Sequence, residues 1–222
     1  MLNKFQEIEL LLKRADEHLE WLRQRVIHPD ADLIPKKLGF YIAEESFDLY
    51  VGRIRIVLGE YTSCLRNALN YPTCALAEQE SKSGVVSNSV QFPIEGCVKS
   101  FKANRNRFLK GIPDKHVAFF ERHQPYNARN RFEILRDYSN AYRHRELGQV
   151  QKVFQRPKEF TTPSQTERVG SFEVEVRFDL ALAVAFPDGS RIIETLEELP
   201  AHVLQTVEEF KPLLAGYLSR SI

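Results

Sequence analysis

The spacing of apolar residues changes along the chain, from a helical period to a strand period and back to a helical period near the C-terminus. Over residues 2–27 the apolar positions recur in steps of three and four, which predicts a helix with a seam like that of a coiled coil. The seam consists of Phe5, Ile8, Leu12, Ala15, Leu19, Leu22 and Val26. It either packs on another helix of the same domain or forms a homodimer interface.

A second long helix is predicted over residues 46–71, where an apolar stripe again has the helical period. Pro72 should kink or restart this helix, which then continues toward Gln79. Gly52 and Gly59 lower the helix propensity of the segment, so they indicate close contact with another helix. Shorter helices are expected over residues 97–110, 113–123 and 131–147.

The C-terminal third changes to a strand period. Apolar residues alternate strictly with other residues over residues 172–186, which predicts one bent strand or two. Residues 187–190 read Pro-Asp-Gly-Ser and predict a hairpin turn, with a return strand over residues 191–193. Residues 149–155 are a candidate for a third strand.

Together these patterns predict the α+β fold class. The expected architecture is an antiparallel bundle of about four to five helices, followed by a C-terminal antiparallel β-hairpin or small sheet and a terminal helix. The terminal helix is expected over residues 200–219, with Pro212 kinking or splitting it. Residues 1–147 would form the helical bundle, and residues 148–222 the hairpin and terminal helix, packed on the bundle as one unit.

The composition is that of a soluble globular domain, with 222 residues, 43% of them apolar and 27% charged. The net charge of +1 excludes a general attraction to nucleic acid, so any basic surface must be local. The opening segment is too charged for a signal peptide, and no apolar run is long enough to span a bilayer, so no membrane partner is expected. The three cysteines lack zinc-ligand spacing, which favours reduced thiols in a cytoplasmic protein. No phosphate-binding loop is present either, and we expect neither a cofactor nor a metal.

The densest potential chemistry lies at the end of the helix predicted over residues 131–147. Arg136, Asn140 and His144 are spaced i, i+4 and i+8, and Arg143 lies between the first two around the helix axis. Arginine beside histidine is the pairing expected where a phosphate or an anionic transition state is held and a proton is moved. Cations at the end of a helix also stabilise its C-terminus, so the same residues have a structural explanation.

The helix over residues 46–71 has a matching polar edge, formed by Arg66, Asn67 and Asn70 beside its apolar stripe. If the two helices pack through their stripes, the two polar edges meet in a pocket rich in Arg, Asn and His. Three interpretations stay open at this point. The residues form a buried polar network that fixes helix register, an anion or nucleotide site, or a charged surface.

The order of several short motifs resembles that of a family of bacterial proteins of similar length. Members carry a Leu-Arg-x-Ala-Leu-Asp pattern, a Phe-Pro-Ile-like segment, Gln-Pro-Tyr, and Leu-x-x-Leu-x-Asn-x-Asp-Lys-His-Arg. The corresponding segments here are residues 65–70, 92–94, 124–126 and 135–145. Asn70 stands where the family has aspartate, and Tyr142-Arg143 where it has Asp-Lys, so a carboxylate-dependent role at these positions is in doubt. The family brings no established activity with it.

The chain is also similar, more loosely, to the HEPN superfamily, which consists of helical-bundle proteins of prokaryotic defence and toxin systems. Many of these are metal-independent ribonucleases that carry Arg and a polar residue a short distance before a His. Asn140 and His144 match that polar residue and that histidine. Arg136 is farther from His144 than in the usual pattern, and the predicted hairpin is an addition to the minimal bundle.

The HEPN resemblance implies RNA as a ligand and, if the protein is an enzyme, metal-independent endoribonuclease activity. His144 would act as the general acid or base. Arg143 and Arg136 would stabilise the pentacoordinate phosphate, and Asn140 would orient His144 or a phosphate oxygen.

Substrate binding is expected from Arg66 and Asn70, and from Lys102 and Arg105 on a basic face of the helix over residues 97–110. The alternative is a non-enzymatic binding or assembly protein, in which the Arg/Asn/His residues are a structural polar network.

Overall fold

The computed structural model describes residues 4–24, 44–81, 86–128, 131–144, 151–155, 181–186 and 192–214. Within these ranges the chain forms seven α-helices, one 3-10 helix and one pair of strands. The helices are α1 (Lys4–Arg23), α2 (Glu44–Glu80), α3 (Val98–Phe108), α4 (Asp114–Arg122), α5 (Pro125–Ala128), α6 (Phe132–Arg143), α7 (Ile192–Phe210) and the 3-10 helix η1 (Lys211–Leu214). The strands are β1 (Gln151–Gln155) and β2 (Ala181–Ala185).

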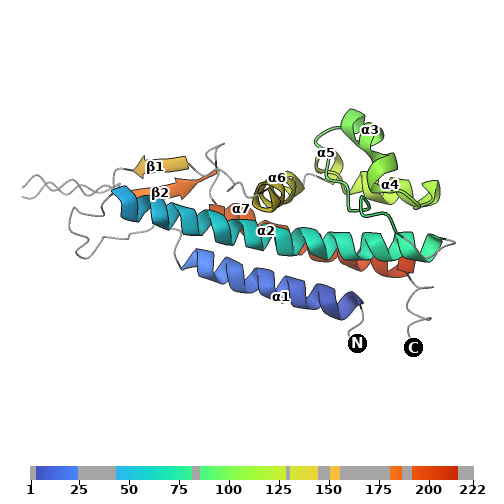
Figure 1. The fold of residues 1–222 in the computed structure, drawn as a ribbon, viewed down its shortest axis with the longest axis horizontal. Helices are drawn as coiled ribbons and strands as arrows, with labels where there is room; N and C mark the ends of the chain where they lie inside the picture. The colour runs from blue at the N-terminus through green and yellow to red at the C-terminus, as the bar shows by residue number, and fades with distance from the viewer. Residues whose placement is uncertain are drawn as a thin grey trace, which may run out of the picture.

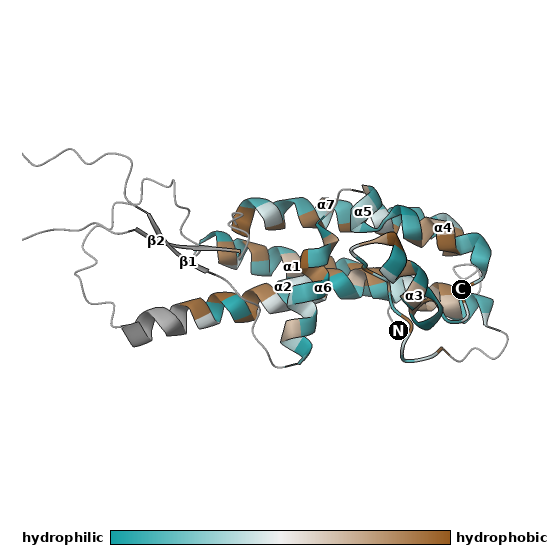
Figure 2. Ribbon diagram, turned by 90° about the horizontal axis from the view of Figure 1, so that it is seen from above, coloured by the Kyte–Doolittle hydropathy of each residue, from teal (hydrophilic) through white to brown (hydrophobic). Residues whose placement is uncertain are grey.

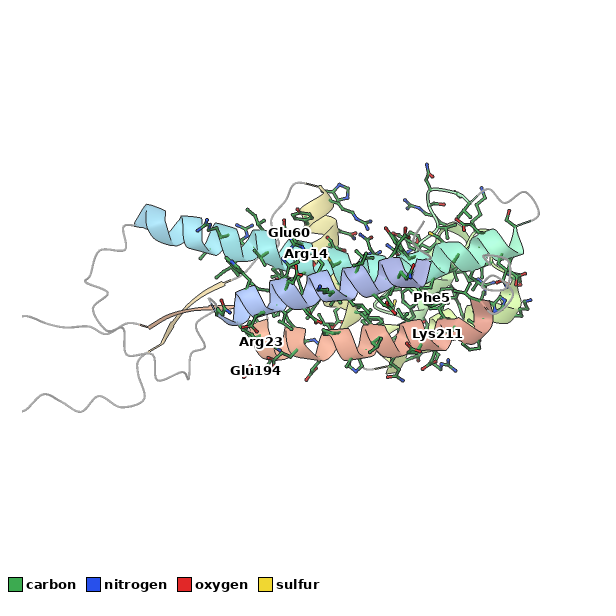
Figure 3. The ribbon with its side chains drawn as sticks, turned by 90° about the horizontal axis from the view of Figure 1, so that it is seen from below. Phe5, Arg14, Arg23, Glu60, Glu194 and Lys211 are labelled. Atoms are coloured by element: carbon green, nitrogen blue, oxygen red, sulfur yellow. The ribbon has the colours of Figure 1, made fainter. Side chains whose placement is uncertain are left out.

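α1 packs antiparallel against α7 on one side of the fold. Near the start of α1, Nζ of Lys211 lies 5.9 Å from the centroid of the Phe5 ring (Figure 3). Near its end, Nε of Arg23 lies 2.8 Å from Oε1 of Glu197. Four seam residues are buried within the chain: Ile8, Ala15, Leu19 and Leu22. The seam therefore packs on helices of the same chain, which is the first of its two alternatives.

α2 is the longest helix, and α7 runs beside it in the same direction (Figure 1). The Tyr61 hydroxyl donates a hydrogen bond of 2.6 Å to the backbone oxygen of Leu196, and Nε2 of Gln79 donates one of 3.2 Å to that of Leu213. The residue numbers rise in both helices from the first contact to the second, so α2 and α7 are parallel. The expected bundle in which all neighbours are antiparallel is therefore wrong. Figure 2 shows apolar and polar residues alternating along α7, as in a helix with one buried face.

α3, α4 and α5 gather at the C-terminal end of α2 (Figures 1 and 2). The fully buried ring of Phe92, in the segment before α3, joins this group to the rest of the core. Its centroid lies 5.7 Å from that of Phe120 in α4, 6.2 Å from that of Phe132 in α6 and 6.3 Å from that of Phe210 in α7. These are favourable distances for aromatic pairs, so one side chain holds three helices together.

Pro72 and Pro200 differ from the prediction, whereas Pro212 agrees with it. α2 continues through Pro72 without interruption as far as its end at Glu80. α7 begins well before the expected start, so Pro200 lies inside it. The α-helix ends at Phe210, and Pro212 lies in η1, in agreement with the predicted split.

The predicted α+β fold class is wrong, because this protein is built from helices. Of the residues whose side chains are described, 82% are helical. β1 and β2 pair antiparallel over five residues, with Gln151 opposite Ala185 and Gln155 opposite Ala181. In the part of the chain that the structure describes, this short pair adds no layer to the helical core.

The predicted hairpin is wrong as well. Ile192 and Ile193 were expected in its return strand, but they begin α7. Further apolar residues follow at helical spacing and are buried: Leu196, Leu199, Val203, Val207 and Phe210. A short apolar pair fits a strand or a helix, and here the long helical stripe that follows decides between them. Residues 172–180 and 187–190 lie outside the described residues.

Candidate functional site

α6 crosses α2 at close range, and this crossing brings the two predicted polar edges together (Figures 1 and 2). A Cβ atom added to Gly59 of α2 would lie 2.7 Å from Cδ2 of Tyr142, a distance that real Cβ atoms essentially never show. Gly59 therefore allows the close helix contact predicted for it. Gly52, by contrast, has no atom within 4 Å of such a Cβ.

Arg66 of α2 lies in this crossing and is only 3% exposed. Its Nη2 lies 3.4 Å from Oε1 of Gln91, longer than a usual N–H···O hydrogen bond. Its Nε and Nη1 are buried and have no hydrogen-bond partner among the described residues. Burial lowers the pKa of Arg66 from 12.5 to about 10, and the nearby charges of Arg143 and Arg136 lower it further in the same direction.

Two asparagines of α2 connect Arg143 to the segment before α3. Nη2 of Arg143 donates a hydrogen bond of 3.4 Å to Oδ1 of Asn67, and Nδ2 of Asn70 lies 3.5 Å from the same oxygen. Oδ1 of Asn70 accepts a hydrogen bond of 2.9 Å from the backbone N–H of Phe92. Asn70 therefore has a structural role, and its amide oxygen fills that role although the resembling family has aspartate at this position.

Gln124 holds the other side of the same segment. Its side chain is fully buried, and its Nε2 donates to the backbone oxygens of Pro93, at 2.9 Å, and Phe120, at 2.8 Å. Its Oε1 accepts from the backbone N–H of Glu95 at 2.8 Å. The four motifs noted in the sequence are thus joined in space through hydrogen bonds of Asn67, Asn70 and Gln124.

The remaining predicted residues of α6 differ in their surroundings. Nε of Arg136 lies 2.6 Å from Oδ1 of Asp137, and this hydrogen bond raises the pKa of Arg136. Asn140 is half-buried, and its backbone oxygen accepts from the N–H of His144 at 3.0 Å. The side chain of His144, at the C-terminal cap of α6, is exposed. Arg136 and Arg143 thus lower the pKa of Arg66, and His144 is exposed at the end of α6, directly after Arg143.

Lys102 and Arg105 lie on α3, outside the crossing of α2 and α6. Lys102 is exposed and Arg105 is half-buried. The link to the crossing is indirect, because the backbone N–H of Gln91 donates to the oxygen of Phe108 at 3.1 Å. This contact joins Gln91 to the last residue of α3 and does not involve Lys102 or Arg105.

Glu60 of α2 contacts both α6 and α1. Its Oε1 accepts from the Tyr142 hydroxyl at 3.5 Å, and its Oε2 lies 3.7 Å from Nδ1 of His18 in α1. Burial, and then the charge of Glu60, raises the pKa of Tyr142. Burial also lowers the pKa of His18, with a contribution from Arg14 in the same direction. The Glu60 carboxylate therefore interacts with His18 of α1 and with Tyr142, and not with the three arginines.

Gln91 and Asp137 were missed by the sequence reasoning. Asp137 directly follows Arg136, and no pattern distinguishes it from any solvated acidic residue. Gln91 precedes the Phe-Pro-Ile segment, and only the folded chain brings it to Arg66, 25 positions away.

The described residues contain no group of three or more His, Cys, Asp or Glu side chains that could hold a metal ion. None of the described helices is long and apolar enough to cross a membrane. No family model, no curated protein and no solved structure matches this chain. The geometry of the α2–α6 crossing is therefore the basis for a functional proposal.

Proposed function

We propose that this protein binds RNA through its phosphate groups, at an arginine cluster formed by Arg66, Arg136 and Arg143. The observation that carries the proposal is the state of Arg66, a buried guanidinium whose Nε and Nη1 have no partner in the described part of the chain. Guanidinium groups bind phosphate oxygens through pairs of parallel hydrogen bonds, so an RNA phosphate supplies what Arg66 lacks.

The electrostatics favour an anionic ligand over a self-contained polar network. A buried charge is strongly unfavourable unless it is paired and hydrogen-bonded. Two further arginines lower the pKa of Arg66 instead of offsetting its charge, after the larger effect of burial. Asp137 and Glu95 oppose this effect more weakly, so the pKa of Arg66 stays lowered, and an anionic ligand would offset the remaining positive charge.

RNA is favoured because basic residues are exposed at the end of α6, beside the crossing, and on α3. Arg143 and His144 are exposed at the end of α6, and Lys102 is exposed on α3. With a net charge of only +1, the chain attracts RNA through such a local surface and not through its overall charge.

A second candidate function is metal-independent cleavage of the bound RNA, favoured by the exposed position of His144 directly after Arg143. His144 would remove the proton from a ribose 2′-hydroxyl, whose oxygen attacks the adjacent phosphorus. The bond from phosphorus to the 5′-oxygen then breaks, and that oxygen takes a proton from water. The products are a 2′,3′-cyclic phosphate and a 5′-hydroxyl end. Arg143 would stabilise the charge of the pentacoordinate phosphate, and Asn140 would orient the imidazole.

Fluorescence anisotropy with a labelled single-stranded RNA, measured over a range of salt concentrations, tests the binding function. Arg66→Met and Arg143→Gln should each weaken binding by about tenfold, as expected for the loss of a charge-assisted hydrogen bond. Arg53→Met is the matched control, because Arg53 is an exposed arginine on the same helix. If the wild type fails to bind RNA, or if all three variants bind equally well, the proposed function is wrong.

Cleavage is tested separately by incubating the protein with transfer RNA and total RNA in the presence of EDTA. His144→Ala should abolish the appearance of 5′-hydroxyl fragments without changing RNA affinity by more than about threefold. Equal fragmentation by the wild type and His144→Ala would eliminate the enzymatic candidate and leave the binding function in place.

A further inference from the structure

The depth of Arg66 restricts which phosphate can reach it. An internucleotide phosphate carries a sugar on each side, and a residue that is only 3% exposed offers little surface to a group flanked by two such substituents. A terminal phosphate has one substituent and three free oxygens, so it can approach a buried guanidinium with its free side forward. We infer that the arginine cluster recognises a phosphomonoester at the end of an RNA chain. This inference rests on the proposed function and names the part of the RNA that the site binds.

The charge of the cluster fits such a group. Arg66, Arg136 and Arg143 supply three positive charges, and Asp137, which bonds to Arg136, removes one. Glu95 acts more weakly on Arg66 and Arg136, and Glu133 acts on Arg136. Oε1 of Glu95 also accepts a hydrogen bond from Nδ2 of Asn104 at 3.0 Å. A phosphomonoester carries a charge of about −1.5 to −2 at neutral pH, whereas a phosphodiester carries a single negative charge. The dianion therefore offsets the excess positive charge more completely.

The side chains of Gln91 and Arg143 lie at the site and make only long contacts there. Oε1 of Gln91 lies 3.4 Å from Nη2 of Arg66, and Nη2 of Arg143 lies 3.4 Å from Oδ1 of Asn67. Both distances exceed the usual range for N–H···O hydrogen bonds. Gln91 is half-buried and Arg143 is exposed, so both side chains can rotate without disturbing the core. A phosphate with three oxygens would replace the two long contacts and reach Nε and Nη1 of Arg66.

The same chemistry is present in a free mononucleotide and in inorganic phosphate, and the experiment separates these sources. Anisotropy is measured with one RNA sequence, labelled internally, that carries a 5′-phosphate, a 3′-phosphate or hydroxyl groups at both ends. The wild type should bind at least one phosphorylated form about tenfold more tightly than the hydroxyl form. Adenosine 5′-monophosphate and inorganic phosphate serve as competitors. Chain-end recognition predicts that each competes only at concentrations about a hundredfold above the RNA.

Arg66→Met and Arg66→Lys should abolish the preference for the phosphorylated end, since lysine keeps the charge but lacks the guanidinium fork. Arg143→Gln, at an exposed position, should reduce the preference even if both Arg66 variants fail to fold, and Arg53→Met should retain it in full. Equal affinity of the wild type for all three RNAs would overturn the inference while leaving the proposed function intact. An end preference that persists in the Arg66 and Arg143 variants, or a mononucleotide that competes at the same concentration as the RNA, would also overturn it. Absence of binding to any of the RNAs would show instead that the proposed function is wrong.

Discussion

Replacing Arg66 with methionine should stabilise the protein when no anion is present. The pKa of Arg66 falls from 12.5 to about 10 in the fold, and each pKa unit corresponds to about 1.36 kcal/mol, so the fold disfavours the charged side chain by about 3 kcal/mol. Methionine has a similar length and requires no hydrogen bonds, but the variant loses the contact to Gln91, which contributes about 1 kcal/mol. The expected net gain is about 2 kcal/mol, or about 4–8 °C in Tm for a chain of this size.

Urea denaturation followed by circular dichroism, in a buffer without phosphate or sulfate, measures this free energy of unfolding. Arg53→Met is the matched control and should stay within about 0.5 kcal/mol of the wild type, because Arg53 is exposed. Adding a 5′-phosphorylated RNA should narrow the difference between the two proteins. A ligand at about a hundredfold its Kd for the wild type stabilises the wild type by about 2.7 kcal/mol, whereas Arg66→Met, which binds about tenfold more weakly, should gain only about 1.4 kcal/mol.

A loss of about 3 kcal/mol or more in Arg66→Met without ligand would refute this reasoning. That result would show that Arg66 stabilises the α2–α6 crossing as part of a satisfied polar network. The protein would then be the non-enzymatic alternative, in which these residues hold helices in register.

Three further predictions concern the structure around the cluster. Gly59→Ala should destabilise the protein by about 1–3 kcal/mol, because its Cβ would lie 2.7 Å from an aromatic ring of α6. Gly52→Ala is the control: its Cβ would have no atom within 4 Å, so it should stabilise the protein by about 0.5–1 kcal/mol. Equal effects of the two substitutions in thermal denaturation would contradict the close contact at Gly59. Gln124→Leu removes three hydrogen bonds from a buried site, so it should lower the free energy of unfolding, measured by urea denaturation, by about 3 kcal/mol or more. A decrease of less than about 1 kcal/mol would contradict this prediction. Burial lowers the pKa of His123, although the carboxylate beside it opposes the shift, so stability should be full above about pH 6.5 and decline as the pH falls below that value. His123→Gln should show a smaller decline between about pH 7 and pH 5, and an unchanged profile would assign the decline to other groups.

The helices could be predicted from the sequence wherever an apolar stripe is long. The helix expected over residues 131–147 is observed as Phe132–Arg143, and the one expected over 46–71 with an extension toward 79 is observed as Glu44–Glu80. Periodicity is informative there because a buried face must repeat every three to four residues over several turns. It is not informative for Ile192 and Ile193, since two adjacent apolar residues fit a strand as well as a helix, and the turn-like sequence before them favoured the wrong choice.

Part of the cluster could be predicted in the same way. The polar edges of two helices were expected to meet if their apolar stripes pack, and Arg143 of α6 does contact Asn67 of α2, the residue that follows Arg66. The exposure of each side chain could not be predicted, because it depends on where α6 crosses α2 and on where the helix ends. His144, expected inside the pocket, is exposed because α6 ends at Arg143.

The hydrogen bonds around the crossing distinguish a structural role from a ligand-binding role, residue by residue. Gln124 uses both ends of its amide, and Asn70 uses its oxygen on a backbone N–H, so these two residues are explained by the fold alone. Arg66 differs from these two residues because it is a buried charge. Its Nε and Nη1 have no hydrogen-bond partner among the described residues. A network that serves only to fix helix register would be expected to satisfy its buried charge first, because a half-satisfied network is less stable than an apolar contact. The donors left over at Arg66, beside two more arginines, are therefore better explained by an anion that the folded protein receives.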